Sequence, residues 1–356
     1  MNVDMRMRSC KLLGSALAIL LLGVARLAAF TSIDADETFS AYTKAFYFAK
    51  GTNGYIRATT AGGRSDFWKC AEEMEMLLDV YERTTNASCL TLFSNVFNGF
   101  TTEHTRYWLS NPYNDDIMWM VIASARGYLH TGNPVYRNVA QSNFDRCFER
   151  AWSTNLGGGL WWTKTNSTKN ACVNGPAAIA SHLLFQITGD TNYLAKSRNI
   201  FEWERATLFN TNSGSVADAI SGNGRIHGWA STYNQGTFIG AANFLGRTNE
   251  ARLAADFTMN QLCREGMFPQ YQQSGDLGGF NGICVRWLAK FMHERRLQSR
   301  YEPWLRQNAE AAWNARRKTD GLIWSRWPEV TPEETLYSWA CSSAVVMLHA
   351  IPSTEK

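Results

Sequence analysis

An apolar segment with helical periodicity recurs six times along this chain of 356 residues. Apolar residues spaced three and four positions apart predict helices, whereas the strict alternation typical of half-buried strands is hardly found. Several repeats close with a turn of one chemistry, HTGNPVY, ITGDTNYL or LGRTNEARL, in which Gly and Asn or Asp end one helix and open the next. We therefore predict six helical hairpins, whose first helices begin near Phe67, Asp115, Asn174, Asn234, Phe280 and Tyr337.

The repeats are spaced roughly 45 to 60 residues apart, the length of two helices and a turn. The first helix of each unit is apolar and the second is more polar, as in residues 136–152 and 250–265. Such hairpins pack against their neighbours and form an open solenoid or a closed toroid. Closure is favoured because the first helices are rich in small residues, as in VIASARG and GAANF, which suits crowding around an axis. The predicted fold class is all-α, with residues 30–356 as one domain.

Residues 1–29 have the order of a secretory signal peptide. Basic residues precede the apolar stretch LLGSALAILLLGV, and small residues follow it, so we expect cleavage and a secreted, extracellular protein. The stretch is short for a membrane span, although an uncleaved anchor is the alternative. The polar C-terminal residues HAIPSTEK carry no lipid-anchor signal, so we expect no stable membrane anchor.

In a secreted protein, two further features of the sequence become relevant, the sequons and the cysteines. The sequons that begin at Asn86 and Asn166 become candidate glycosylation sites of a glycoprotein. Seven of the eight cysteines follow the predicted signal peptide and become candidates for disulfide bonds. Because seven is odd, at least one thiol must stay unpaired or bond to another chain. We expect a monomer.

Composition argues against several classes of function. The net charge is only +4 and basic residues form no long run, so nucleic-acid binding is not expected. Neither metal-ligand spacing of Cys and His nor a P-loop or G-x-S-x-G motif is found, so we expect no metal and no cofactor. Aromatic residues reach 13% of the chain, with 14 tryptophans, which provides flat surfaces for packing or for stacking on a ligand.

Two adjacent carboxylates, Asp115 and Asp116, stand at the start of the second apolar segment, in YNDDIMWM. A carboxylate at a helix N-terminus gains about 0.3 to 1 kcal/mol, so helix capping is one interpretation. The other is sugar cleavage, in which one carboxylic acid protonates the leaving oxygen while another attacks carbon or activates water. Neighbouring helical residues point about 100° apart, so both groups could converge on one bond at the short separation of a retaining enzyme. Their mutual repulsion would keep one of them protonated.

If the ring closes, the N-terminal ends of the first helices share one rim with several long loops, where binding sites are commonly built. One such loop contains GGLWW, whose rings either pack against the core or face a substrate. Another contains Asp218 in a glycine-rich setting, where it is either a turn residue or a hydrogen-bond partner of sugar hydroxyls.

Four stretches, YNDDIMWMVIASARGYLHTGNPVY, GGLWWTKTNSTKNACVNG, TYNQGTFIGA and FNGICVRWLAKF, together resemble glycoside hydrolase family 76, the endo-α-1,6-mannanases of bacteria and fungi. The resemblance runs roughly from Phe67 to Leu348. It implies an (α/α)6 barrel and retaining hydrolysis of α-1,6-linked mannan without metal, with Asp115 as nucleophile and Asp116 as general acid/base. The groove would then be lined by Tyr113, Trp119, Trp161, Trp162, Asn170, Asn174, Asp218, Tyr233, Asn234 and Gln235.

The function implied by the resemblance is that of a secreted endo-glycosidase acting on α-mannan or another mannose-containing polysaccharide, such as mannoprotein glycans. One alternative is a cell-wall transglycosylase of the same family. A second is a non-catalytic mannan-binding wall protein, in which the two aspartates only cap a helix. The chain departs from the family's F-K-G pattern at Asn281, which stands where lysine is expected.

Overall fold

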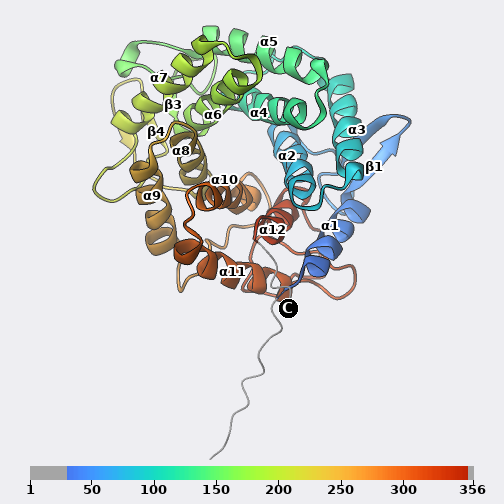
Figure 1. The fold of residues 1–356 in the computed structure, drawn as a ribbon. Coiled ribbons are helices and arrows are strands. Elements are labelled where there is room, and N and C mark those ends of the chain that lie inside the picture. Colours follow the sequence, from blue (N-terminus) through green and yellow to red (C-terminus); the bar gives the residue numbers. More distant parts are fainter. Residues whose placement is uncertain (1–29, 352–356) are drawn as a thin grey trace, which may run out of the picture.

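The computed structural model describes residues 30–351, in which twelve α-helices form two concentric rings (Figure 1). The inner ring contains α2 (Phe67–Thr84), α4 (Asn114–Thr131), α6 (Ala171–Thr188), α8 (Thr232–Phe244), α10 (Phe280–Glu294) and α12 (Ser338–Ala350). The outer ring contains α1 (Ser32–Phe46), α3 (Ala87–His104), α5 (Pro134–Ala151), α7 (Thr191–Thr207), α9 (Thr248–Phe257) and α11 (Gln298–Asn314). Each inner helix contacts the next, and α12 returns to α2. The closed (α/α)6 barrel is confirmed.

The sixth hairpin is formed in a way that the repeat pattern did not predict. Its inner helix is α12, but its outer helix is α1, which precedes all the other helices of the described chain and packs against α12 (Figure 1). The buried face of α1 includes Ala35, Tyr42 and Phe46. On the other side of the contact, His349 of α12 lies with Nε2 3.0 Å from the carbonyl oxygen of Ala35.

In the predicted Gly-Asn and Gly-Asp turns, the glycine ends the inner helix and the Asn or Asp caps the start of the outer helix. Gly132 and Gly189 follow α4 and α6 in the left-handed conformation, with φ of 66° and 71°, which an L side chain adopts only at a cost. The next residues begin the outer helices, since Asn133 Oδ1 accepts from the backbone of Val135 and Asp190 Oδ1 from that of Asn192. Each turn thus reverses the chain within a few residues.

Small residues allow the inner helices to approach closely. Gly236 of α8 lies against α10 so tightly that a Cβ built on it would stand 2.5 Å from the Cα of Cys284. Gly175 of α6 meets Thr237 of α8 in the same manner, with 2.6 Å to its Oγ1. The small residues in the inner segments are therefore required by helix-to-helix distance, as the sequence suggested.

Five short strands were not predicted. Strands β1 (Tyr47–Lys50) and β2 (Asn53–Ile56) form an antiparallel hairpin at the periphery. Strands β3 (Thr168–Asn170), β4 (Ala219–Ser221) and β5 (Ile226–His227) form an antiparallel sheet in the order β3-β4-β5. With two to four residues each, these strands are too short for an alternating pattern to be visible. The second sheet ties together the long loops that precede α6 and α8.

Four further expectations concern the signal peptide, membrane spans, disulfide bonds and glycosylation sites. The predicted signal peptide, residues 1–29, lies outside the described residues. Within residues 30–351, the helices are all too short or too polar to cross a membrane. The seven cysteines of this part of the chain are unpaired and buried, so the structure does not support the expected disulfides. The sequon residues Asn86 and Asn166 are both exposed.

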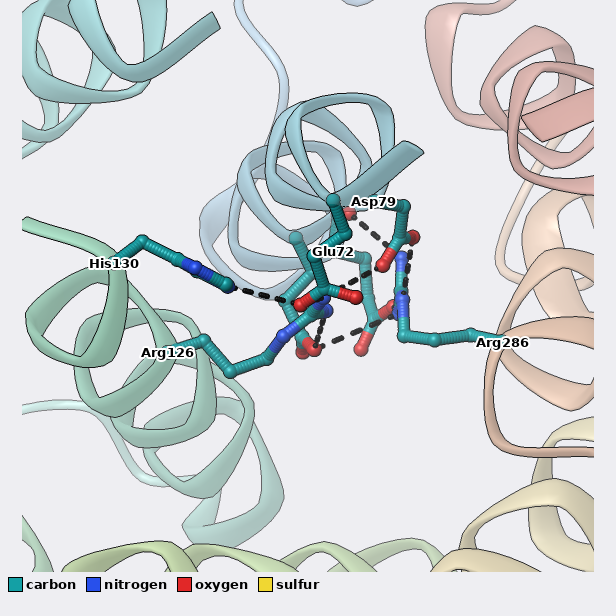
Figure 2. A network of polar contacts seen from close by, with 7 residues as sticks. Glu72, Asp79, Arg126, His130 and Arg286 are labelled. Carbon is teal, nitrogen blue, oxygen red and sulfur yellow. Dashed lines mark hydrogen bonds and ion pairs between the residues drawn. The ribbon is translucent and has the colours of Figure 1, made fainter. Parts of the chain in front are cut away.

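A network of buried charges crosses the centre of the ring (Figure 2). It arises from acidic residues that share one face of α2, namely Glu72, Glu75, Asp79 and Glu82. Arg126 of α4 donates to Glu75, Asp79 and Glu82 over 2.8 to 2.9 Å, and from the opposite side Arg286 of α10 binds Asp79 at 2.7 Å and also Glu72. Both arginines are only 7% exposed. The inner helices, predicted to be apolar, thus also carry charged groups at α2, α4 and α10.

Candidate active site

A cavity of about 670 Å³ opens at the rim where the inner helices begin. Residues at the starts of α2, α4, α6, α8 and α10 contribute to its wall, as predicted for the N-terminal rim. Its lining consists of aromatic rings and acids: Asp66, Phe67, Trp68, Tyr113, Asp115, Asp116, Trp119, Trp162, Asn170, Cys172, Asp218, Trp229, Tyr233, Asp276, Leu277 and Phe280. We call this the rim cavity.

A larger cavity of about 860 Å³ lies at the opposite mouth of the barrel, where the inner helices end. Its charged side chains are largely engaged with one another or with neighbours. Lys290 pairs with Glu294 at 2.6 Å, for example, and Arg295 donates to the side chain of Asn243 at 2.8 Å. Basic side chains at helix C-termini complement the helix dipoles there. Paired carboxylates beside stacking rings occur at the rim cavity, which is therefore the candidate active site.

Asp115 and Asp116 both face the rim cavity from the first turn of α4. The residue at the N-cap is Tyr113, whose side chain makes no capping hydrogen bond. Asp115 Oδ2 accepts from the thiol of Cys172 at 3.4 Å, and the side chain of Trp162 also stabilises the ionised form of this carboxyl group. Asp116 Oδ2 accepts from the side-chain amide of Asn111 at 2.9 Å. The two carboxylates are thus set in different surroundings.

These surroundings raise the pKa of both groups. Burial is the larger cause for Asp115, and the neighbouring charge of Asp116 raises its pKa further. Burial also raises the pKa of Asp116, but the hydrogen bond from Asn111 opposes the rise, so the effect is smaller. At neutral pH the pair is therefore poised to share a proton.

Aromatic rings form much of the wall around the two acids. Tyr233 stacks on Phe280 with a centroid distance of 3.8 Å, and Trp68 lies 6.3 Å from Trp119 at the floor. Trp229 stands at the edge and is 50% exposed. Flat apolar faces beside carboxylates are suited to a sugar ring, which presents both C–H faces and hydroxyl groups.

The sheet β3-β4-β5 positions the polar side of the cavity. Asn170 and Ala219 are paired across β3 and β4, and the backbone N–H of Ala171 donates to the carbonyl of Asp218 at 2.8 Å. Asp218 and Asn170 therefore line the cavity together. Asn234 does not line it, but its Nδ2 donates to Asp218 Oδ1 at 3.2 Å and so orients that carboxylate.

Besides Asn234, three predicted groove residues do not line the rim cavity, and their structural roles explain why. Asn174 is fully buried and binds both the N–H and the carbonyl of Leu160. Gln235 is fully buried and accepts from the N–H of Val216 while donating to the carbonyl of Gly214. Trp161 is 6% exposed, and its ring lies 4.7 Å from the ammonium group of Lys169. These side chains hold the long loops in place instead of facing a ligand.

Several lining residues were missed. Trp68 and Phe280 lie in the first turns of predicted inner helices, so the argument that selected Asp115 would also have found them. Asp66 and Asp276 come from loops before α2 and α10, and both bind Lys69, at 2.9 and 3.1 Å. Their proximity to Asp115 and Asp116 depends on closure of the ring, and no local sequence pattern indicates it.

The comparisons with known proteins bear on this geometry. The family model described as Glycosyl hydrolase family 76 matches residues 28–350. The chain belongs to this family. None of the curated protein sequences that were compared matches it. Membership of family 76 agrees with the barrel and supports glycoside hydrolase activity.

Solved structures of family 76 relatives have the same fold. The α-1,6-mannanase of Salegentibacter sp. HEL1_6 has 27% identity and a TM-score of 0.82, over 89% of this chain and 98% of that chain. An inactive variant of it, with two consecutive aspartates replaced by asparagine, is in complex with α-1,6-mannotriose, at 27% identity, a TM-score of 0.83 and the same coverage. Dfg5 from Chaetomium thermophilum, in complex with glucosamine, shares the fold at 17% identity, with a TM-score of 0.73 over 89% of this chain and 87% of that one.

The contact between Cys172 and Asp115 in this family 76 site leads to a first prediction. Replacing Cys172 by Ala removes the donor to Asp115 Oδ2 and raises the pKa of Asp115 further, because an ionised carboxylate loses a partner. We expect the acidic limb of the pH profile of kcat/KM to move to higher pH, with a loss on that limb of about fivefold, the worth of about 1 kcal/mol. Cys172→Ser keeps a donor and should keep the limb near its original position. Identical profiles for all three proteins would contradict a role for the thiol.

Proposed function

We propose that this protein is a secreted, retaining endo-glycosidase that hydrolyses α-1,6-mannosidic linkages of mannan or mannoprotein glycans. The observation that carries the proposal is the placement of adjacent Asp115 and Asp116 in a cavity walled by tryptophans at the barrel rim. Family membership supports glycosidase chemistry, and the relative bound to α-1,6-mannotriose supports mannose as the sugar. Residues 1–29 would direct secretion, which N-terminal sequencing of the exported protein would test.

In the proposed mechanism the two carboxyl groups act in two steps. First, Asp116 gives its proton to the bridging oxygen while Asp115 attacks the anomeric carbon, so that the C–O bond breaks and a glycosyl ester forms on Asp115. Then a water gives its proton to Asp116 and its oxygen bonds to the anomeric carbon, which releases Asp115. Two inversions at one carbon retain its configuration.

The raised pKa values of the pair place one requirement on substrate binding. Attack requires Asp115 ionised and Asp116 protonated, although burial and the neighbouring carboxylate both raise the pKa of Asp115. A bridging oxygen that accepts a hydrogen bond from Asp116 favours protonated Asp116, and positive charge developing on the sugar favours ionised Asp115. Substrate entry therefore favours the protonation state that the reaction needs, with Asp115 ionised and Asp116 protonated.

The proposed activity is tested with linear α-1,6-mannan as substrate. We expect the secreted protein to release reducing ends and to produce a ladder of short manno-oligosaccharides from early times, as an endo-acting enzyme does. NMR of the first products should show the α-anomer, because retention preserves configuration. A protein that binds mannan without releasing reducing ends would refute hydrolysis. Products longer than the substrate would instead identify a transglycosylase.

A further inference from the structure

Lys169 of β3 has a fully buried side chain that the mechanism above does not use. Its ammonium group donates to the carbonyl oxygens of Ser153 and Asn155, at 2.9 and 2.6 Å, and also to that of Gly158. The three N–H donors of the group thus meet three acceptors. Burial lowers the pKa of Lys169 to about 8, and within residues 30–351 no carboxylate opposes this shift. At pH 7 and below, backbone dipoles therefore stabilise a buried positive charge.

The three carbonyl oxygens belong to the loop 153–159, whose backbone conformation needs support. Leu156 and the three glycines that follow it all have positive φ, between 58° and 130°. The left-handed region is unfavourable for a residue with a side chain, and a run of glycines is highly flexible in the unfolded chain. Trp203 of α7 covers the loop, and its Nε1 donates to the carbonyl of Leu156 at 3.0 Å. The loop is thus held by Trp203 on one side and by Lys169 from within.

This loop leads directly into the two tryptophans beside the rim cavity. The ring of Trp161 lies 4.7 Å from the ammonium group of Lys169, and Trp162 lines the cavity. The carbonyl of Trp161 accepts from Asn114 Nδ2 at 2.7 Å, and that of Trp162 accepts from the backbone N–H of Asn114 at 2.8 Å. Asn114 directly precedes Asp115. Residues 153–162, which we call the anchored segment, therefore also fix the start of α4.

Trp162 is the residue of the anchored segment that acts on the nucleophile. Its side chain stabilises the ionised form of Asp115, so its displacement raises the pKa of that carboxyl group. The titratable groups that face Asp115 are Asp116 of its own helix, Cys172 of α6 and Tyr233 of α8. None of them belongs to the anchored segment. A change in the loop should thus reach Asp115 through Trp162.

We propose that Lys169 is a positioning residue, which folds the loop 153–159 around its ammonium group and thereby holds Trp162 beside Asp115. The inference rests on the proposed glycosidase function and adds to it a residue that does not line the rim cavity. In chemical terms, the three converging carbonyl oxygens form a cation site that the chain fills with its own side chain.

The first test is Lys169→Met, which keeps the size of the side chain but removes its charge and donors. We expect faster hydrogen–deuterium exchange at the amides of Trp161 and Trp162, which are hydrogen-bonded in the parent. With α-1,6-mannotetraose, the acidic limb of the pH profile of kcat/KM should move to higher pH. The rate on that limb should fall by about tenfold, the loss typical of a hydrogen bond to a charged group. The control is Lys164→Met, at an exposed lysine just beyond the anchored segment, which should behave as the parent.

The second test restores the missing group from solution. Lys169→Ala lacks the atoms of n-propylammonium, so adding this cation should raise kcat/KM in a saturable manner, by about threefold or more. The same concentration of n-propanol, which has the same size without the charge, should raise it less. Trp203→Phe loosens the same loop more mildly, by removing the donor to Leu156, and should move the acidic limb in the same direction by a smaller amount.

A Lys169→Met protein that is folded and keeps the acidic limb of the parent would overturn the proposal, because the lysine would then contribute to stability alone. Equal recovery with the alcohol, or recovery with neither compound, would also count against it. If the lysine variants do not fold, an unmoved limb in Trp203→Phe would overturn the proposal. A parent protein without activity would instead contradict the proposed glycosidase function, while hydrogen exchange would still test the anchoring of the loop by Lys169.

Discussion

Replacing either Asp115 or Asp116 with Asn is expected to lower turnover of α-1,6-mannan by about 10²- to 10⁴-fold, the usual range for loss of an acid–base or covalent group. Asparagine is nearly the same size, so the cavity keeps its shape while the nucleophile or the proton donor is lost. Release of reducing ends under saturating and limiting substrate would measure both kcat and kcat/KM. With an aryl leaving group, Asp116→Asn should retain more of the first step than Asp115→Asn, because a good leaving group needs no proton.

The same substitutions separate catalysis from helix capping. Burial raises the pKa of both groups, so the folded state does not gain from their charges, and the Asn variants should unfold at the same temperature as the parent or higher. The control is Asp190→Asn at the N-cap of α7, where Oδ1 accepts from Asn192 and an Asn can do the same. It should retain full activity. Unchanged turnover in both active-site variants would favour the capping interpretation and a non-catalytic protein.

The largest expected effect on stability is at Arg286 in the centre of the ring. Its side chain binds Asp79 at 2.7 Å and also binds Glu72, and all three side chains are at most 9% exposed. Replacing Arg286 with Met leaves these carboxylates buried without that partner, which should lower the free energy of unfolding by about 3 to 5 kcal/mol. Urea unfolding followed by tryptophan fluorescence would measure the change.

The deficit of Arg286→Met should depend on pH in a defined direction. Burial already raises the pKa of Glu72, and Arg286 opposes that rise, so its removal raises the pKa further. A raised carboxyl pKa favours the fold below the pKa of the unfolded chain, and the contribution is lost as the pH rises through the folded value. The deficit should therefore be smaller at pH 5 than at pH 8. Arg300→Met is the control, since Arg300 is about half exposed and its pair with Asp256 should contribute only about 1 kcal/mol. A similar small loss at both positions would contradict a structural role for the network.

The fold was predictable because its signal is local and repeated. Each inner segment carries its own apolar periodicity, and glycines such as Gly132 and Gly189 mark its end. The pairing of α1 with α12 was not predictable. Nothing in the sequence of α1 indicates that this helix is the outer helix of the hairpin whose inner helix is α12. The charges of Glu72 and Glu75 were also missed, because single acids among apolar residues resemble the solvent face of a helix until the ring closes around them.

The site was predictable where a residue's type and its place at a helix start both pointed to the rim, as for Asp115 and Trp119. The same criteria failed for Asn174 and Gln235, because a long loop over a buried helix also needs amide side chains to satisfy its backbone. Sequence position alone cannot separate these two uses of an amide.

The pairing of α1 with α12 sets an order for folding during synthesis. Helix α1 leaves the ribosome before every other helix of the described chain, but its partner is made last, so Tyr42 and Phe46 stay without their final contacts until then. Hairpins between them can form from local contacts as they emerge, whereas ring closure joins distant parts of the chain and must follow. A product that stops before Ser338 would present the apolar face of α1 as a persistent chaperone-binding surface. Closure of the ring therefore requires α12, the last helix of the described chain.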